Sequence, residues 1–133
     1  MAASRVVVTA QTLPGSYPDL PPVAGSLALG FQAADPSLKN YTPLVSGKTV
    51  LLAMNTDSSA HTVTVSSVPD DQNRKGDITA YSLAAIDGTT PVIVPLGVFT
   101  AKGWLTPTDA TTPAGLWFEA NSATVKFAVL TLP

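Results

Sequence analysis

The chain has 133 residues, of which 12% are charged and 45% apolar, with a formal net charge of −2 and no cysteine. This length suits one domain with a single hydrophobic core, and the missing cysteines exclude disulfides and thiolate metal sites. The weak negative charge argues against nucleic acid as a partner, because phosphates are neutralised by clustered lysine and arginine.

Twelve prolines and nine glycines interrupt a chain rich in valine and threonine. β-Branched residues suit a pleated, half-buried surface, so the composition predicts an all-β fold. Few charges in so apolar a chain indicate that a partner or a homo-oligomer covers part of the surface, although simple stickiness explains the same composition. No run reaches the roughly eighteen apolar residues of a membrane span, and the first residues lack a signal-peptide core. We expect no membrane partner, and synthesis in the cytoplasm of the cell that produces the protein.

Residues 1–26 combine an apolar run with a proline-rich segment. Arg5–Leu13 is expected to form one strand, because its apolar residues alternate. The segment after it cannot lie in a central strand, because proline lacks the N–H group that a sheet requires. We interpret it as an extended arm that crosses a neighbouring surface, or as an ordinary long loop. Six of its residues are candidate interface residues: Pro14, Tyr17, Pro18, Leu20, Pro21 and Pro22.

Residues 27–133 are predicted to form the β domain. A short apolar strand is expected over Ser26–Phe31, followed by the turn-rich Ala33–Tyr41 with one helical turn after Pro36. Lys48–Asn55 is apolar without interruption, which predicts a strand that is covered on both faces.

His61–Val68 alternates, with Val63 and Val65 predicted to point inward. This run and Lys48–Asn55 are separated by the turn-forming residues 55–60, so the two are predicted to pair as a hairpin. After a charged loop, Asp77–Leu83 is expected to form a third strand.

The C-terminal half contains three further strand patterns. Pro91–Leu96 follows an Asp87-Gly88 turn and is bounded by prolines, which places it at a sheet edge. Residues 97–115 are expected to be mostly loop. Leu116–Ala120 and Thr124–Leu132 are predicted to close the chain as a second hairpin, with Val125, Phe127 and Val129 of the last strand on one face.

Seven or eight short strands separated by turns predict an all-β fold. The expected architecture is an antiparallel β-sandwich, or a jelly-roll or β-tulip-like barrel, with an extended proline-rich N-terminal arm.

No set of residues predicts an active site. His61 is the one histidine, and catalysis by a Ser-His-Asp arrangement needs a nucleophile and a carboxylate beside it. Neither a G-x-S-x-G motif nor a histidine spacing typical of zinc occurs. We interpret His61 as a surface residue and expect no catalytic residue, no metal, no cofactor and no enzyme activity.

The charged loop at residues 69–78 partly follows a calcium-loop pattern. Asp71, Asn73, Gly76 and Ile78 occupy its first, third, sixth and eighth positions. However, the fifth position is a lysine and the twelfth is a serine rather than the bidentate glutamate, and neither flank is helical. The loop is therefore predicted to be a hairpin tip.

Three aromatic residues of the β domain are further candidates for an interface or for a sugar-stacking platform: Phe99, Trp104 and Trp117. Core packing is the alternative for each, because large aromatic rings fill sheet interfaces as readily as they bind partners.

The stretch VLLAMNTDSSAHTVTVSSVPDD (residues 50–71) and the C-terminal ATVKFAVLTLP (residues 123–133) resemble small structural proteins of tailed double-stranded DNA bacteriophages. In those proteins an LL-x-x-N-T/S strand, a TVTV strand, a loop ending in G-D and an AVLRLP-like terminal strand recur. The resemblance covers about residues 48–133. The chain departs from it in the Thr/Pro-rich insert at 107–113 and at Thr131, where a basic residue is common.

This resemblance implies a capsid auxiliary protein, also called a decoration or cement protein. Such proteins are β-sandwich or β-tulip domains that bind the outer surface of the phage head, often as trimers. The implied partner is the major capsid protein and the implied location is the virion. Two alternatives remain: a carbohydrate- or cell-surface-binding β-sandwich module, and a phage tail or head–tail joining component.

Overall fold

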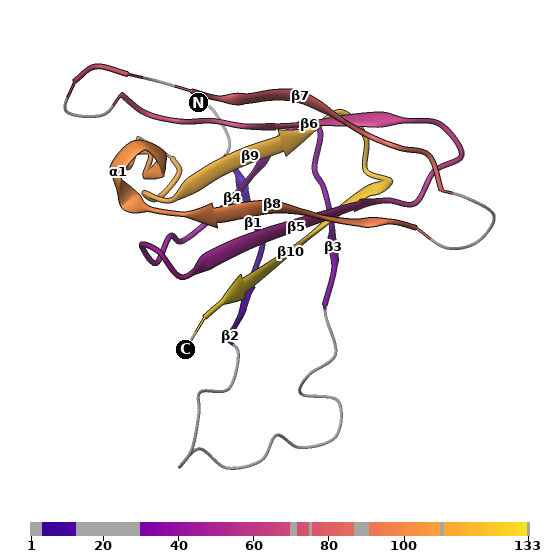
Figure 1. Cartoon of the computed structure of the whole chain (residues 1–133), viewed down its shortest axis with the longest axis horizontal. Helices are drawn as coiled ribbons and strands as arrows, with labels where there is room; N and C mark the ends of the chain where they lie inside the picture. Colours follow the sequence, from indigo (N-terminus) through magenta and orange to yellow (C-terminus); the bar gives the residue numbers. More distant parts are fainter. Residues whose placement is uncertain are drawn as a thin grey trace, which may run out of the picture.

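The computed structural model describes residues 4–12, 30–69, 72–74, 76–86, 91–109 and 111–132. These residues form ten strands and one short helix (Figure 1). In chain order the elements are β1 (Val6–Val7), β2 (Ala10–Thr12), β3 (Gln32–Ala33), β4 (Asn40–Thr42), β5 (Thr49–Asn55), β6 (His61–Val65), β7 (Ile78–Leu83), β8 (Ile93–Phe99), α1 (Ala101–Trp104), β9 (Leu116–Ala120) and β10 (Val125–Thr131).

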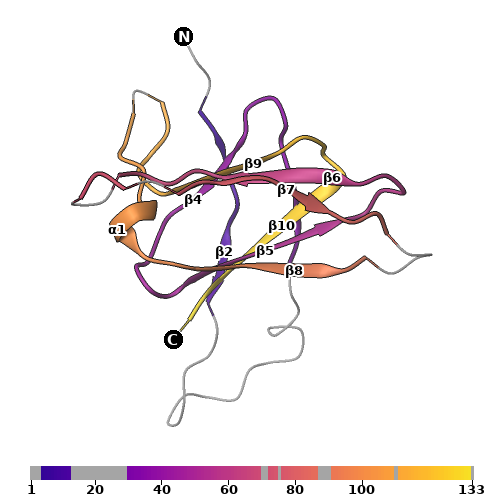
Figure 2. The same ribbon diagram turned by 45° about the horizontal axis from the view of Figure 1, so that its top comes forward.

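The strands lie in two facing sheets, which Figure 2 shows as two layers. The sheet with the order β1-β4-β9-β6-β7 is called the β9 sheet, and the sheet with the order β2-β10-β5-β8, to which β3 adds on β10, is called the β5 sheet. The predicted β-sandwich is therefore confirmed. The sheets are mixed rather than purely antiparallel, because β1 pairs in parallel with β4 and β2 in parallel with β10.

The core lies between the two sheets. Phe118 of β9 and Phe127 of β10 meet edge to face at its centre, with ring centroids 4.6 Å apart and an interplanar angle of 69°. Val63 and Val65 of β6 are buried, which confirms that they point inward, and Val125, Phe127 and Val129, which were predicted to share one face of β10, are buried as well.

Both predicted hairpins are wrong. β5 and β6 belong to different sheets, and so do β9 and β10. The chain crosses between the sheets at both turns, and the two turns are tied together, since Thr56 donates its N–H (3.0 Å) and its hydroxyl (2.7 Å) to the carbonyl oxygen of Thr124. An alternating strand followed by a short turn fits such a crossing as well as a hairpin, so local pattern did not distinguish them.

The hairpin that does form is β6–β7, whose strands pair antiparallel on either side of the charged loop. β7 and β8 are the last strands of their sheets, which confirms the edge position predicted for Pro91–Leu96. Both edges are interrupted: Ala80 in β7 has a positive φ of 50°, and Pro95 in β8 lacks an N–H group. Such interruptions discourage the edge-to-edge pairing of exposed strands.

β5 is not covered on both faces, contrary to the sequence prediction. Its side chains alternate between fully buried and half-buried along the whole strand. Val50, Leu52 and Met54 therefore form an apolar outer face, which the uninterrupted apolar pattern did not distinguish from a second buried face.

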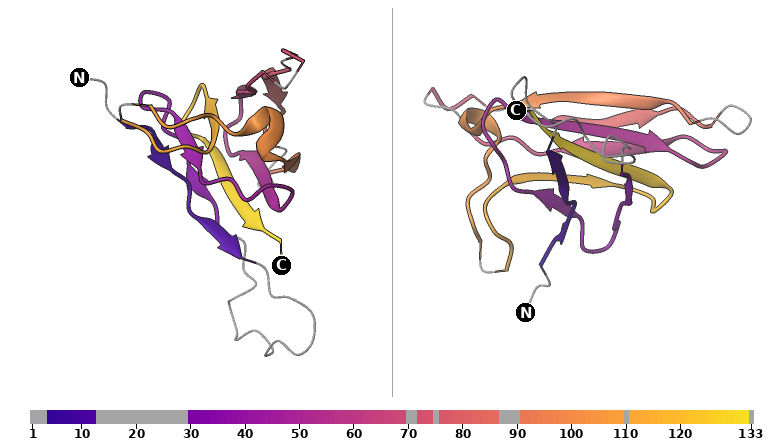
Figure 3. Two further views of the ribbon diagram at one scale, coloured as in Figure 1. Left: turned by 90° about the vertical axis from the view of Figure 1, so that its left-hand side faces the viewer. Right: turned by 90° about the horizontal axis from the view of Figure 1, so that it is seen from below.

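The N-terminal run is also not one strand. It breaks after β1, so that β1 joins the β9 sheet and β2 joins the β5 sheet. Val8, between the two strands, lies in the core with 1% exposure. Figure 3 shows both strands in indigo along one side of the molecule. The boundary predicted after residue 26 therefore does not separate residues 4–12 from the sandwich.

Two further predictions concern the connections. The strand expected over Ser26–Phe31 lies partly outside the described residues, and β3 begins after it at Gln32. The turn-rich character of residues 33–41 is confirmed by a turn at residues 36–38, where Asp35 Oδ1 accepts the N–H groups of Ser37 (3.0 Å) and Leu38 (2.9 Å). The predicted Asp87-Gly88 turn lies outside the described residues.

Candidate functional site

Residues 4–12, which we call the N-terminal strap, pair with distant parts of the chain, and we call the residues that contact the strap the strap groove. The backbone N–H groups of Val6 and Val8 donate to carbonyl oxygens of the β4 segment at 2.8 and 2.9 Å. Two buried side chains of β4 also donate hydrogen bonds to the strap. Asn40 Nδ2 donates to the Val6 carbonyl (3.2 Å) and Thr42 Oγ1 to the Val8 carbonyl (3.0 Å). The groove therefore binds the strap as a peptide, with main-chain and side-chain hydrogen bonds.

Arg5 anchors the start of the strap. Its guanidinium carbon lies 4.3 Å from the ring centroid of Trp117, a cation–π geometry. Its Nη1 also donates to the carbonyl oxygens of Asn40 (3.1 Å) and Phe118 (3.3 Å). Burial lowers the pKa of Arg5 from its usual value, and the nearby Glu119 carboxylate opposes that shift. Arginine is a cation at neutral pH in proteins, and these contacts hold the start of the strap against β9.

Residues 106–109 and 111–115 contact the strap from the other side. Thr112 is buried, and its hydroxyl oxygen accepts the backbone N–H of Arg5 at 3.1 Å. The Ser4 hydroxyl donates to the Thr111 carbonyl. Gly115 allows the loop to approach β4, because a Cβ atom there would lie 2.4 Å from the Thr42 carbonyl oxygen. The Thr/Pro insert of the sequence is thus part of the groove for the strap.

Asp109 holds the shape of that loop. Its Oδ1 accepts the N–H groups of Thr111 (2.8 Å) and Thr112 (2.7 Å). Both hydrogen bonds lower the pKa of Asp109 below its usual 3.8, and the bond from Thr111 has the larger effect.

This shift predicts an acid-sensitive contribution to stability. A carboxyl whose pKa is lower in the folded than in the unfolded protein stabilises the fold above the unfolded pKa, and loses that effect as the pH falls through the folded pKa. We expect the urea midpoint of the wild type to fall as the pH drops below about 4, and Asp109→Asn to show a smaller fall. Equal pH dependence in both proteins would contradict this role.

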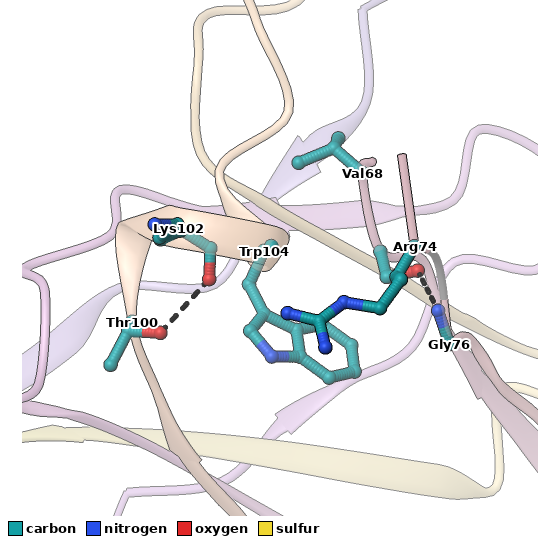
Figure 4. Close-up of a pocket in the computed structure, with 8 residues that line it drawn as sticks. Val68, Arg74, Gly76, Thr100, Lys102 and Trp104 are labelled. Atoms are coloured by element: carbon teal, nitrogen blue, oxygen red, sulfur yellow. Dashed lines mark hydrogen bonds between the residues drawn. The ribbon is translucent and has the colours of Figure 1, made fainter. Parts of the chain in front are cut away.

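A second feature is a cavity of about 510 Å³ beside α1 and the β6–β7 loop (Figure 4). Trp104 forms one side, and Figure 4 shows the Arg74 guanidinium beside its indole. The Trp104 ring is held edge to face on Phe99, with centroids 4.8 Å apart. Gly103, with a φ of +93°, makes the bend that presents the tryptophan. The full lining is Ser67, Val68, Arg74, Gly76, Thr100, Lys102, Gly103 and Trp104.

The cavity combines an aromatic ring with polar and cationic groups. The hydroxyl of Ser67 is already engaged, since it donates to Asp77 Oδ1 (2.7 Å) and accepts the Gly76 N–H (2.9 Å). An indole beside a guanidinium can stack on the apolar face of a sugar ring while hydrogen bonds reach its oxygens. The cavity thus suits a small polar ligand.

A third feature is the outer face of the β5 sheet. Its side chains meet across the strands, because Val50 pairs with Val98 and Met54 with Ile93. Val98 and Ile93 are 54% and 46% exposed. The apolar outer face, as we call it, comprises Val50, Leu52, Met54, Ile93, Pro95, Val98 and Leu130, and it is bordered by Lys126, which pairs with Met54.

His61 is less exposed than the sequence suggested. Its side chain is 19% exposed and its Nε2 lies 2.8 Å from Asp57 Oδ2. Ser58 is hydrogen-bonded to the same aspartate, not to the histidine. The His61–Asp57 hydrogen bond links the two sides of the turn between β5 and β6, and it lowers the pKa of Asp57.

The calcium-loop pattern falls partly outside the described residues, which exclude Asp71 and Lys75. Asp77, at its seventh position, is turned to Ser67, whose N–H and hydroxyl both donate to Oδ1 at 2.7 Å. Across the described residues, no group of three or more histidine, aspartate or glutamate side chains could hold a metal ion.

No family model, curated protein or solved structure matches this chain. The resemblance to phage decoration proteins therefore stays a prediction that rests on the sequence pattern. No helix in the described part of the chain is long and apolar enough to cross a membrane.

The predicted interface residues have different positions. Phe99 is a core residue with 3% exposure, so its ring is not available to a partner. Trp104 is half-buried in the cavity, and Trp117 is half-buried beneath Arg5. The six candidates in the proline-rich arm, Pro14 to Pro22, lie outside the described residues.

Sequence reasoning missed Arg5 and Thr112. They bind each other although 107 residues separate them. The single arginine in an apolar N-terminal run was the one available signal, and it did not indicate its partners.

Proposed function

We propose that the chain is a structural virion protein that binds the outer surface of a tailed-phage head and stabilises it, with the major capsid protein as its partner. The observation that carries this proposal is the apolar outer face of the β5 sheet. Contiguous exposed apolar surface on a folded domain is typical of protein–protein contact sites. The sequence resemblance supplies the identity of the partner, and the two-sheet sandwich is compatible with it.

Stabilisation of a shell requires many contacts rather than one strong contact. A trimer that bridges several capsid subunits would gain avidity from effective concentration, even where each contact is modest. A homo-oligomer, as a trimer, is therefore part of the proposal.

Virion composition tests the location. In particles purified from the phage that carries this gene, we expect mass spectrometry to find hundreds of copies per virion, and cryo-microscopy to place them on the head. A few copies, or about a dozen, would instead indicate a tail or head–tail joining component. Absence from the particles would contradict every virion role.

The apolar outer face can be tested separately with the double variant Ile93→Lys/Val98→Lys. Both side chains are about half exposed, so the fold should be retained. Burial of two such side chains contributes a few kcal/mol, so we expect binding to heads that lack the protein to weaken about 100-fold or more. Tyr81→Lys, at a 45% exposed position of the β9 sheet, is the matched control. Equal binding by the variant and the control would exclude this face.

The cavity beside Trp104 favours a second candidate, a carbohydrate-binding module. We expect any glycan bound in a glycan-array measurement to be lost on Trp104→Ala, because the substitution removes the ring on which the sugar would stack. Leu105→Ala, whose 36% exposed side chain does not line the cavity, is the control and should retain binding. No glycan bound by the wild type, or equal binding by Trp104→Ala, would contradict this candidate.

A further inference from the structure

We propose that the N-terminal strap can occupy the strap groove of a second copy of the chain, so that the protein assembles by strand exchange. This inference goes beyond the proposed function and does not depend on it, because it concerns the purified protein alone.

The residues that bind the strap lie outside the strap itself. The hydrogen-bond and strand-pairing partners of the strap described above lie in β3, β4 with the residue before it, the loop that contains Thr111 and Thr112, β9 and β10. The same set is therefore present on any copy of the chain. The strap is recognised along its length, by Trp117 at Arg5, by β4 at β1 and by β10 at β2.

The strap contributes edge strands to both sheets. β1 is the end of the β9 sheet and β2 an end of the β5 sheet. Removal of an edge strand leaves the inner pairings of each sheet in place, and an extended peptide can add to a sheet edge from outside the chain. Exchange of such an element between identical copies forms the same contacts twice, which is why domain swapping is a low-cost route to oligomers.

The connection after the strap, residues 13–31, is much longer than the distance between its two ends requires. Thr12 pairs with Thr131 and Gln32 with Phe127, so both ends lie on β10 four residues apart. Four residues of a strand span roughly 13 Å. The intervening residues 13–31 number nineteen, and such a chain can span roughly 60 Å when extended. The connection can therefore reach a neighbouring copy.

The composition of the connection favours that reach. Pro14, Pro18, Pro21 and Pro22 fix φ and restrict the residues that precede them. Proline-rich segments are semi-rigid and extended, so less entropy is lost when the segment bridges two molecules. Because the strap contacts are the same in both arrangements, the connection and the protein concentration decide between them.

The absence of cysteine from the chain permits a direct test. Thr12→Cys and Thr131→Cys place thiols on paired residues of β2 and β10. The two single variants are mixed at high concentration, unfolded, refolded together and oxidised. Strand exchange predicts a covalent heterodimer on a non-reducing gel, because the Thr12→Cys strap reaches the Thr131→Cys groove only between chains. Thr12→Cys mixed with Ser58→Cys, at an exposed turn position, is the control for random collision, and we expect at least ten times less heterodimer.

The double variant Thr12→Cys/Thr131→Cys shows that the pair can form a disulfide, and it should give intrachain bonds and interchain bonds together. Val7→Cys with Tyr41→Cys repeats the test on β1 and β4. Heterodimer no more abundant than in the control at both pairs would overturn the proposal. That result would leave capsid binding and the virion composition unaffected.

Discussion

Phe127→Ala is expected to lower the free energy of unfolding by about 3–5 kcal/mol. Phe127 is fully buried and meets Phe118 edge to face across the two sheets, with centroids 4.6 Å apart. Its removal loses the transfer of the ring from water, leaves a cavity between two rigid sheets, and removes an aromatic pair. Urea unfolding followed by tryptophan fluorescence measures the change. For a domain whose total stability is about 5–15 kcal/mol, this is a large fraction.

The matched control is Tyr81→Ala, because Tyr81 is an aromatic residue that is 45% exposed on the edge strand β7. It should change the free energy of unfolding by less than about 1 kcal/mol. A loss of that small size for Phe127→Ala would show that the two sheets do not pack as described.

Truncation of residues 1–9 is expected to destabilise the sandwich by several kcal/mol. It removes Val8 from the core, where its burial contributes about 1.5–3 kcal/mol. It also leaves the buried side chains of Asn40 and Thr42 without their partners on the strap, and each unsatisfied buried group costs about 1–3 kcal/mol. Circular dichroism should show either a much lower melting temperature or no cooperative transition.

Two single variants separate packing from strand loss in that experiment. Val8→Ala, at a residue with 1% exposure, should cost about 2 kcal/mol, while Val7→Ala, at 40% exposure, should cost less than about 0.5 kcal/mol. A truncated protein as stable as the full chain would show that the strap is an appendage, as the predicted boundary after residue 26 assumed.

The strap also connects the candidate functions to the fold. A segment that completes two sheets is part of the stability of each copy, so an exchanged strap would link the copies of an oligomer through their own edge strands. The apolar outer face lies on the β5 sheet, to which β2 also belongs. Self-association through the strap and contact with another surface therefore use different parts of one sheet.

Much of the fold was predictable because its signals are local. Alternation in the β6 strand identified its inward valines, because successive side chains of a strand point to opposite faces. The prolines around β8 identified an edge strand, because proline lacks the N–H group that an inner strand needs. The charged loop was correctly interpreted as a hairpin tip, because the strand patterns on either side of it are consecutive in the chain and the two strands pair antiparallel.

The sequence by itself therefore determined the all-β class, most strand positions, the inward residues of β6 and the set of residues that share one face of β10. Only the tertiary structure decided which strands pair, because a short turn after an alternating strand leads equally well to the same sheet or to the opposite one, as at β5–β6 and β9–β10. It also decided that Phe99 is buried and that Arg5 meets Trp117. Contacts between residues more than a hundred positions apart depend on how both sheets close around the core, and no local pattern encodes that closure.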